Sequence, residues 1–251
     1  MASKGKIKLK KNVKITFGII LAVIAIALVE SIIQGRHVGN VQITIKNYEN
    51  NAFLDSTEIK RLLTKNNTEK LSNFSYRDIS IKGLESRVKA NLFVRECEIA
   101  RNLQGDLFVD VTLNRPIARY MRKGKPDFYL DSLGNRMPTV QKYTAKVLLI
   151  TSKKKNLPDF EGKNKNLLIL LNKIDRDKFL KAQITQLDIN QYGEITMYPQ
   201  IGSQVIEFGK CINLKDKLKR LKIFYTKILR LKGWQAYNKL SLKYDHQIIC
   251  E

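Results

Sequence analysis

The longest apolar stretch in the sequence runs from Ile15 to Ile33, and Glu30 is the one charged residue within it. Its nineteen residues would extend about 28 Å as a helix, close to the thickness of a bilayer's hydrocarbon core. The preceding residues 1–14 contain six lysines and no acidic residue. We therefore predict a cytoplasmic basic tail over residues 1–14 and a transmembrane helix over residues 15–33. Two other interpretations are a cleaved signal peptide, for which Ala25-Ile26-Ala27 offers a weak cleavage site, and a buried core helix.

After a linker over residues 34–40, which contains two glycines, the apolar pattern indicates a small α+β domain over residues 41–115. The run from Val41 to Ile45 alternates apolar with polar residues, as in a half-buried strand. Asp55 and Glu58 have the three-residue spacing of a capping box, which predicts the start of a helix. The predicted elements follow the order β-α-α-β-β: a strand from Val41, helices over 55–63 and 78–90, and strands over 93–101 and 107–113.

From Pro116 onward the pattern predicts a second, β-rich domain over residues 116–251. The longest soluble helix begins at Asn213 and stops at Gly233. Helical spacing gives it one apolar face, formed by Leu214, Leu218, Leu221, Tyr225, Ile228 and Leu231. The other predicted elements are strands over 127–130, 146–151, 183–190, 194–198, 202–208, 240–244 and 247–250, a turn over 131–135, a loop over 153–166 and a helical region over 167–180. The predicted fold class is therefore α+β, with a single N-terminal transmembrane helix.

The charge and the cysteines limit the functional classes. The formal net charge is +23, of which the tail contributes +6 and residues 15–251 carry +17. In a cytoplasmic protein this balance would suggest nucleic acid, but outside the membrane it favours anionic lipid headgroups, acidic proteins or simple solubility. Cys97, Cys211 and Cys250 are too few for a disulfide scaffold, and we expect Cys97 and Cys211 to be core residues.

No motif in the sequence predicts an enzyme, a cofactor or a metal site. Glycine-rich phosphate loops and a nucleophile elbow are absent, and His37 and His246 lie far apart in the sequence. Glu96 and Glu98 fit a solvated strand face better than a catalytic pair. Basic residues flank the apolar face of the long helix, and we interpret them mainly as a solvated surface: Lys215, Lys217, Lys219, Arg220, Lys222, Lys227, Arg230 and Lys232.

The order of several short stretches carries a family resemblance. The stretches are Val41–Ile45, Asp55–Ile59, Ala90–Ile99, Leu107–Ala118, Phe128–Pro138 and Lys239–Asp245. Preceded by a basic tail and one membrane helix, this order resembles the FtsQ/DivIB family of bacterial cell-division proteins. The first four stretches are similar to that family's POTRA domain and the exit from it, and the last two to the opening hairpin and a terminal strand of its β domain.

This resemblance implies a non-catalytic scaffold in the cytoplasmic (inner) membrane, with the bulk of the chain in the periplasm at the division septum. The implied partners are FtsB- and FtsL-type proteins, one of which would add a strand to the edge formed by residues 240–250. The implied contact residues are Tyr244, His246, Gln247 and Ile248. Val94 lies in the POTRA hairpin implied in recruitment, and the alternative interpretation, a core position for Val94, is the one that we favour. Tyr244 could likewise simply cover the core.

Two hypotheses of other classes stay open. One is a membrane-anchored basic module that binds anionic lipid or nucleic acid, with an affinity that falls steeply with salt. The other is a POTRA-bearing component of an outer-membrane translocation system, although such proteins usually repeat the module and end in a barrel. We expect no nucleic acid partner for a scaffold outside the membrane.

Overall fold

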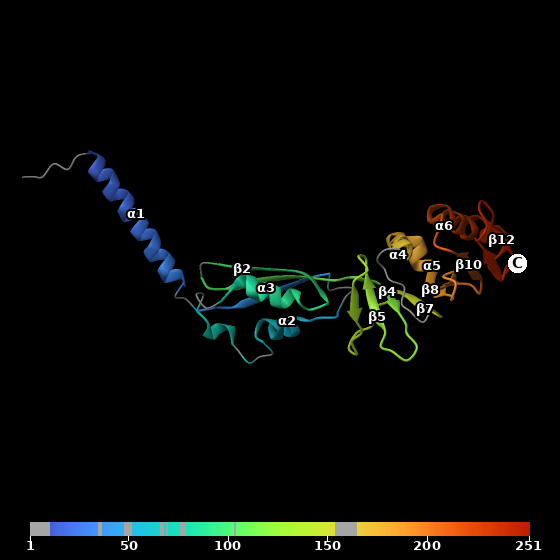
Figure 1. Ribbon diagram of the computed structural model, residues 1–251, viewed down its shortest axis with the longest axis horizontal. Coiled ribbons are helices and arrows are strands. Elements are labelled where there is room, and N and C mark those ends of the chain that lie inside the picture. Colours follow the sequence, from blue (N-terminus) through green and yellow to red (C-terminus); the bar gives the residue numbers. More distant parts are fainter. Residues whose placement is uncertain are drawn as a thin grey trace, which may run out of the picture. The chain divides into compact units, whose positions relative to one another are not determined.

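A computed structural model of the chain describes residues 11–34, 37–47, 52–65, 68, 70–75, 79–102, 104–153 and 165–251, without the side chains of 11–14, 32–34 and 72 (Figure 1). The predicted tail up to residue 10, the middle of the predicted linker and most of the predicted loop over 153–166 lie outside the described residues. The chain forms two compact units: Met1–Lys46 with Leu54–Thr112, and Asn47–Phe53 with Leu113–Glu251.

The N-terminal apolar stretch forms the helix α1 (Lys11–Gln34), so the predicted helix is confirmed. Apolar residues lie on all sides of α1. Their side chains are exposed along its length, from Ile15 at 53% through Phe17 at 66% to Val29 at 57%. Within the described part of the chain, no helix has both the length and the mean hydropathy that a membrane span requires.

The rest of the first unit is a three-stranded sheet with two α-helices, in the predicted order β-α-α-β-β. Its elements are β1 (Val41–Lys46), α2 (Ser56–Leu63), the short 3-10 helix η1 (Leu71–Asn73), α3 (Ile81–Lys89), β2 (Val94–Arg101) and β3 (Leu107–Leu113). The strand order is β1-β3-β2, and β1 runs parallel to β3. Cys97 is fully buried, which confirms the predicted core position, and burial raises the pKa of its thiol to about 11.

Local sequence signals fix the ends of these elements. The Glu58 amide donates to Asp55 Oδ1 at 2.9 Å and the Asp55 amide donates to Glu58 Oε2 at 2.9 Å, which confirms the predicted capping box. In the described end of the predicted linker, the Gly39 amide donates to the Gly105 carbonyl at 2.7 Å. A Cβ at Gly39 would lie 2.7 Å from Asp106 Oδ1 and 3.3 Å from the Gly105 carbonyl oxygen, so a larger residue would have to displace the Asp106 side chain.

The second unit is built on one mixed nine-stranded sheet with the order β12-β11-β10-β9-β8-β7-β4-β5-β6. Its strands are β4 (Pro116–Tyr120), β5 (Phe128–Asp131), β6 (Arg136–Pro138), β7 (Leu148–Ser152), β8 (Ile184–Ile189), β9 (Ile195–Pro199), β10 (Val205–Gly209), β11 (Lys239–Ser241) and β12 (Ile249–Cys250). Parallel pairing joins β4 with β7, β7 with β8 and β10 with β11. The predicted hairpins of β5 with β6 and of β8 with β9 are confirmed.

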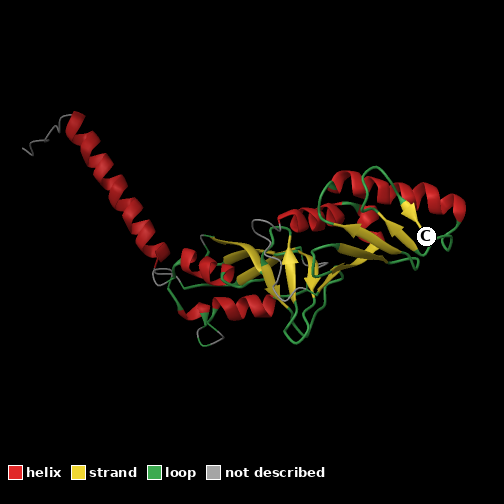
Figure 2. Ribbon diagram, turned by 45° about the vertical axis from the view of Figure 1, so that its right-hand side comes forward, coloured by secondary structure: helices red, strands yellow, loops and turns green. Residues whose placement is uncertain are grey.

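Helices connect two of the parallel pairs, because parallel neighbours cannot be joined by a tight hairpin. Between β7 and β8 lie α4 (Lys165–Arg176) and α5 (Lys178–Gln183). Between β10 and β11 lie α6 (Leu214–Ile223), the π-helical turn η3 (Phe224–Ile228) and α7 (Leu229–Lys232). Figure 2 shows these helices on one side of the strands.

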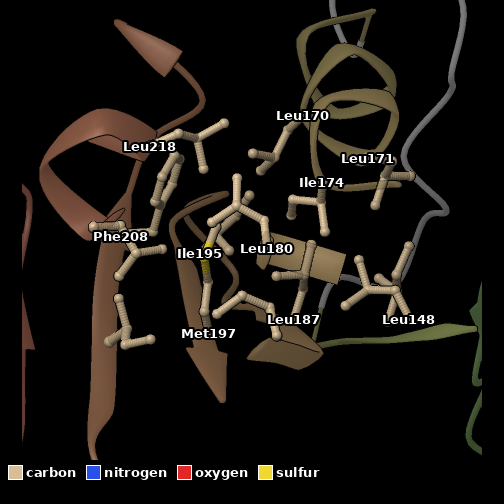
Figure 3. Packing of buried hydrophobic residues seen from close by; sticks show 14 of the residues in the cluster. Leu148, Leu170, Leu171, Ile174, Leu180, Leu187, Ile195, Met197, Phe208 and Leu218 are labelled. Atoms are coloured by element: carbon tan, nitrogen blue, oxygen red, sulfur yellow. The ribbon is translucent and has the colours of Figure 1, made fainter. Parts of the chain in front are cut away.

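Side chains from the helices and from the covered sheet face form the core of the second unit (Figure 3). Leu170, Ile174 and Leu180 come from α4 and α5, and Leu218 comes from α6. They pack against Leu148, Leu187, Ile195, Met197 and Phe208 of the strands. Burial of this apolar surface is the main favourable contribution to the folding of the unit.

The predicted apolar face of the long helix is partly wrong. Leu218, Leu221 and Tyr225 are buried as predicted, but Leu231 is 85% exposed. Helical spacing itself explains the difference: at 3.6 residues per turn, Leu229 lies about 20° around the axis from Leu218, whereas Leu231 lies about 140° from it. Leu229 is therefore buried in place of Leu231. The predicted stop at Gly233 is confirmed, with φ at +95°.

We expect Leu221→Ala to destabilise the second unit by about 2–5 kcal/mol, because it leaves a cavity at a fully buried position. Urea unfolding followed by the fluorescence of Trp234, the single tryptophan, measures this change. The matched control is Leu231→Ala, which removes the same atoms from an exposed site and should change the unfolding free energy by less than about 0.5 kcal/mol. Equal effects of the two substitutions would contradict the assignment of the helix faces.

Candidate functional site

The strand β12 forms one edge of the nine-stranded sheet, with β11 as its neighbour. Leu240 pairs with Cys250 and Ser241 with Ile249 in antiparallel register. Beyond them, the Glu251 and Lys239 amides each donate to the other residue's carbonyl at 3.0 Å. Because hydrogen-bonded and non-hydrogen-bonded pairs alternate in an antiparallel ladder, the N–H and C=O groups of Cys250 point away from β11. This edge therefore presents backbone groups that a further strand could pair with.

The strands at this edge are shorter than predicted. The predicted strands over 240–244 and 247–250 are observed as Lys239–Ser241 and Ile249–Cys250. The chain leaves the sheet at Leu242 and turns back through His246, which has a positive φ of 58°. We name residues 243–248 the edge turn.

The edge turn brings together four of the five predicted contact residues. Tyr244 is 58% exposed, and His246 and Gln247 are exposed beside it. Ile248 is half-buried and packs against the core cluster. The fifth residue, Val94, is the first residue of β2 in the first unit, and its side chain is buried at 6% exposure. The structure therefore places Val94 in a core, as the alternative interpretation of that residue expects.

Arg220 of α6 donates hydrogen bonds to two backbone carbonyls of the edge turn. The sequence did not lead us to predict this role of Arg220. Its Nη1 donates to the Tyr244 carbonyl at 2.8 Å and also to the Gln247 carbonyl, while its Nε donates to Asp216 Oδ2 at 2.8 Å. A second link joins Asn213 Nδ2 to Asp245 Oδ1 at 3.1 Å. In the sequence, Arg220 stands next to Leu221 at the border of the apolar face, a position that does not by itself distinguish a buried arginine from a solvated one.

Lys217 is a second buried basic residue of α6, at 2% exposure. The prediction that it belongs to a solvated surface is therefore wrong. Its Nζ donates to the carbonyls of Phe208 at 2.8 Å and of Lys210 at 3.0 Å. It also lies 5.1 Å from the centre of the Phe208 ring. Burial lowers the pKa of Lys217 below its usual value. The ammonium group thus satisfies carbonyl groups where β10 ends.

Ion pairs cross the strands beside the edge. Lys239 lies 3.2 Å from Glu207 and 3.6 Å from Glu251, while Lys243 lies 3.5 Å from Glu207 and 3.8 Å from Glu194. Burial raises the pKa of Glu207, but the hydrogen bond from Lys239 and the charge of Lys243 outweigh burial, so its pKa is lowered overall. Through Glu207, these pairs connect β10 with Lys239, at the start of β11, and with Lys243, at the start of the edge turn.

Comparison with known protein families matches both units of the chain. The family described as FtsQ/DivIB, C-terminal related matches residues 115–251, which include every strand from β4 to β12. A POTRA-like domain matches residues 37–112, which cover the β-α-α-β-β module. Comparison with curated proteins gave no match.

We expect Glu207→Gln to destabilise the second unit by up to about 1 kcal/mol at neutral pH, because it weakens two cross-strand ion pairs. Since the folded pKa of Glu207 lies below its ordinary value of 4.5, the stabilisation is complete above about pH 4.5 and is lost as the pH falls through the lowered pKa. Urea unfolding of both proteins between pH 7 and pH 3 measures the difference. Glu251→Gln is the control, because its carboxylate is 65% exposed and should contribute less. A difference between wild type and Glu207→Gln that does not decrease as the pH falls from 7 to 3 would contradict the electrostatic origin.

Proposed function

Because the chain belongs to the FtsQ/DivIB family, we propose that it is a non-catalytic scaffold of the bacterial division machinery, with FtsB- and FtsL-type proteins as its partners. The family predicted from the sequence is thereby confirmed, together with its POTRA-like module. The partners, their binding site and the membrane anchor are the parts of this proposal that need experiments.

The observation that carries the proposal is the edge strand β12, which has outward backbone groups and directly follows the edge turn with its exposed Tyr244. In the proposed complex, a partner strand pairs with the N–H and C=O groups of Cys250. β12 is only two residues long, so backbone pairing alone offers few hydrogen bonds and side chains must add affinity. The aromatic ring of Tyr244 offers a large contact area at low entropic cost, with His246 and Gln247 beside it.

We propose that α1 anchors the chain in the cytoplasmic membrane as a single-pass type II helix. The support is the apolar character of α1 on all its sides, which in a helix is typical of burial in a core or in a bilayer. Six lysines precede the apolar stretch and would stay in the cytoplasm. Both folded units would then lie in the periplasm at the division septum.

The alternative of a basic module that binds anionic lipid or nucleic acid has less support. Two of the basic residues of α6, Lys217 and Arg220, are buried and donate to backbone carbonyls, so neither is available to phosphate groups. Binding by strand addition should also depend less on salt than binding to phosphates.

We expect Tyr244→Ala to weaken binding of the FtsB-type protein of the same organism by about tenfold or more, as for an exposed aromatic hot spot. Titration of the purified partner measures the dissociation constant, and Tyr244→Phe, which keeps the ring, should bind nearly as wild type does. The fold should be unchanged, because the Tyr244 side chain is 58% exposed. Equal binding by wild type and Tyr244→Ala would remove Tyr244 from the contact surface.

We expect the full chain to remain in the membrane fraction after extraction with alkaline carbonate, because an apolar helix inserts more firmly than a peripheral surface binds. A chain that starts at Val41 should appear in the soluble fraction. Release of the full chain by carbonate would contradict the membrane anchor while leaving the partner-binding proposal intact.

A further inference from the structure

The tip of the edge turn, residues 244–247, buries little apolar surface, whereas the flanking Ile248 packs against the core cluster and Lys243 forms ion pairs. Tyr244, Asp245, His246 and Gln247 are all exposed, so burial of apolar surface does not fix their backbone. His246 has φ at 58°, a left-handed conformation that is uncommon for residues other than glycine, although histidine adopts it more often than most. The conformation of the turn must therefore be determined by groups that it contacts.

Arg220 supplies those contacts from the helix beneath. One of its nitrogens, Nη1, donates to the carbonyls of Tyr244 and Gln247, one at each side of the turn. Bonding both carbonyls to a single atom brings the two sides of the turn together. The Arg220 side chain is itself buried, and Asp216 one helical turn earlier fixes its guanidinium through Nε at 2.8 Å.

A planar guanidinium suits this task better than an ammonium group would. Its five N–H donors lie in one plane and have fixed directions, so one edge can bind a carboxylate while another edge binds carbonyls. Lysine at this position would keep the charge but lose the fixed geometry. Asn213, which precedes the first residue of the same helix, donates a hydrogen bond to Asp245 at 3.1 Å. With the bonds from Arg220, three residues of the turn are therefore bonded to this helix or its first flanking residue.

We propose that Arg220 is a positioning residue for partner binding: by holding the carbonyls of Tyr244 and Gln247, it sets the orientation of Tyr244 and the start of β12. The proposal rests on the proposed function, because it concerns the same binding edge. Arg220 acts through the turn and does not itself contact the partner. Its contribution to affinity comes from ordering the edge before the partner arrives.

Hydrogen exchange and partner binding test the proposal with the full chain in detergent. Two amides are informative: that of Leu242, just before the turn, donates to the Glu207 carbonyl of β10, and that of Glu251, just after β12, donates to the Lys239 carbonyl of β11. In Arg220→Met both amides should exchange about tenfold faster, since loss of bonds to a charged group makes opening of the hairpin easier. Amides of β8 and β9 should keep their wild-type rates, and binding of the FtsB-type protein should weaken about tenfold. Arg220→Lys should give intermediate values for both measurements.

Lys219→Gln is the matched control, because it removes a positive charge from an exposed position on the same helix and should change neither measurement. Unchanged exchange in Arg220→Met overturns the proposal, and so does faster exchange throughout the second unit, which would indicate a general structural role. Faster exchange confined to the hairpin with undiminished binding also overturns it, provided that Tyr244→Ala weakens binding. If Tyr244→Ala has no effect on binding, the proposed contact site fails instead, and the exchange data still decide whether Arg220 holds the turn.

Discussion

The parallel pairing of β10 with β11 is the constraint on which the candidate site depends. Parallel neighbours require a long crossover, and here the chain crosses one face of the sheet as α6, η3 and α7. The crossover places Lys217 where it donates to the Phe208 carbonyl of β10, and Arg220 where it donates to the Tyr244 carbonyl of the edge turn. The edge turn and β12 follow β11, and β12 forms one edge of the described sheet.

Burying two cations in α6 has an energetic cost that the structure offsets locally. An uncompensated buried charge is strongly unfavourable. Lys217 and Arg220 are each stabilised by two backbone carbonyls, and Arg220 also by Asp216. Those carbonyls lie where β10 ends and where the chain leaves the sheet, so they lack the ladder partners that strands provide. These bonds couple the helix to the edge and offset part of the cost, while Nη2 of Arg220 is buried without a hydrogen-bond partner among the described residues.

Signals that act over a few residues predicted much of the fold. The capping box of Asp55 and Glu58 and the stop at Gly233 depend on local backbone geometry, and both are observed. The assignment of Leu231 to the apolar face was wrong for a local reason: around an α-helix it lies about 140° from Leu218, whereas Leu229, about 20° from Leu218, is the residue that is buried. The contact residues of the edge turn were placed by family resemblance. Arg220 was missed because an arginine at the border of an apolar face looks the same in sequence whether water or a buried carbonyl receives its hydrogen bonds.

The edges of the two sheets differ in how well they resist pairing with another chain. At the opposite edge of the nine-stranded sheet, β6 ends in Pro138, which has no N–H to donate, and begins with the exposed Arg136. In the first unit the edge strand β2 carries charged residues of both signs, Arg95, Glu96, Glu98 and Arg101. Charges and proline are the usual means of blocking unwanted strand addition. β12 consists of Ile249 and Cys250 and has neither. An edge without these protections avoids unwanted pairing if it is short or if a partner covers it. β12 has two residues and follows an ordered turn, so a specific partner strand could pair with β12 and contact the side chains of the turn.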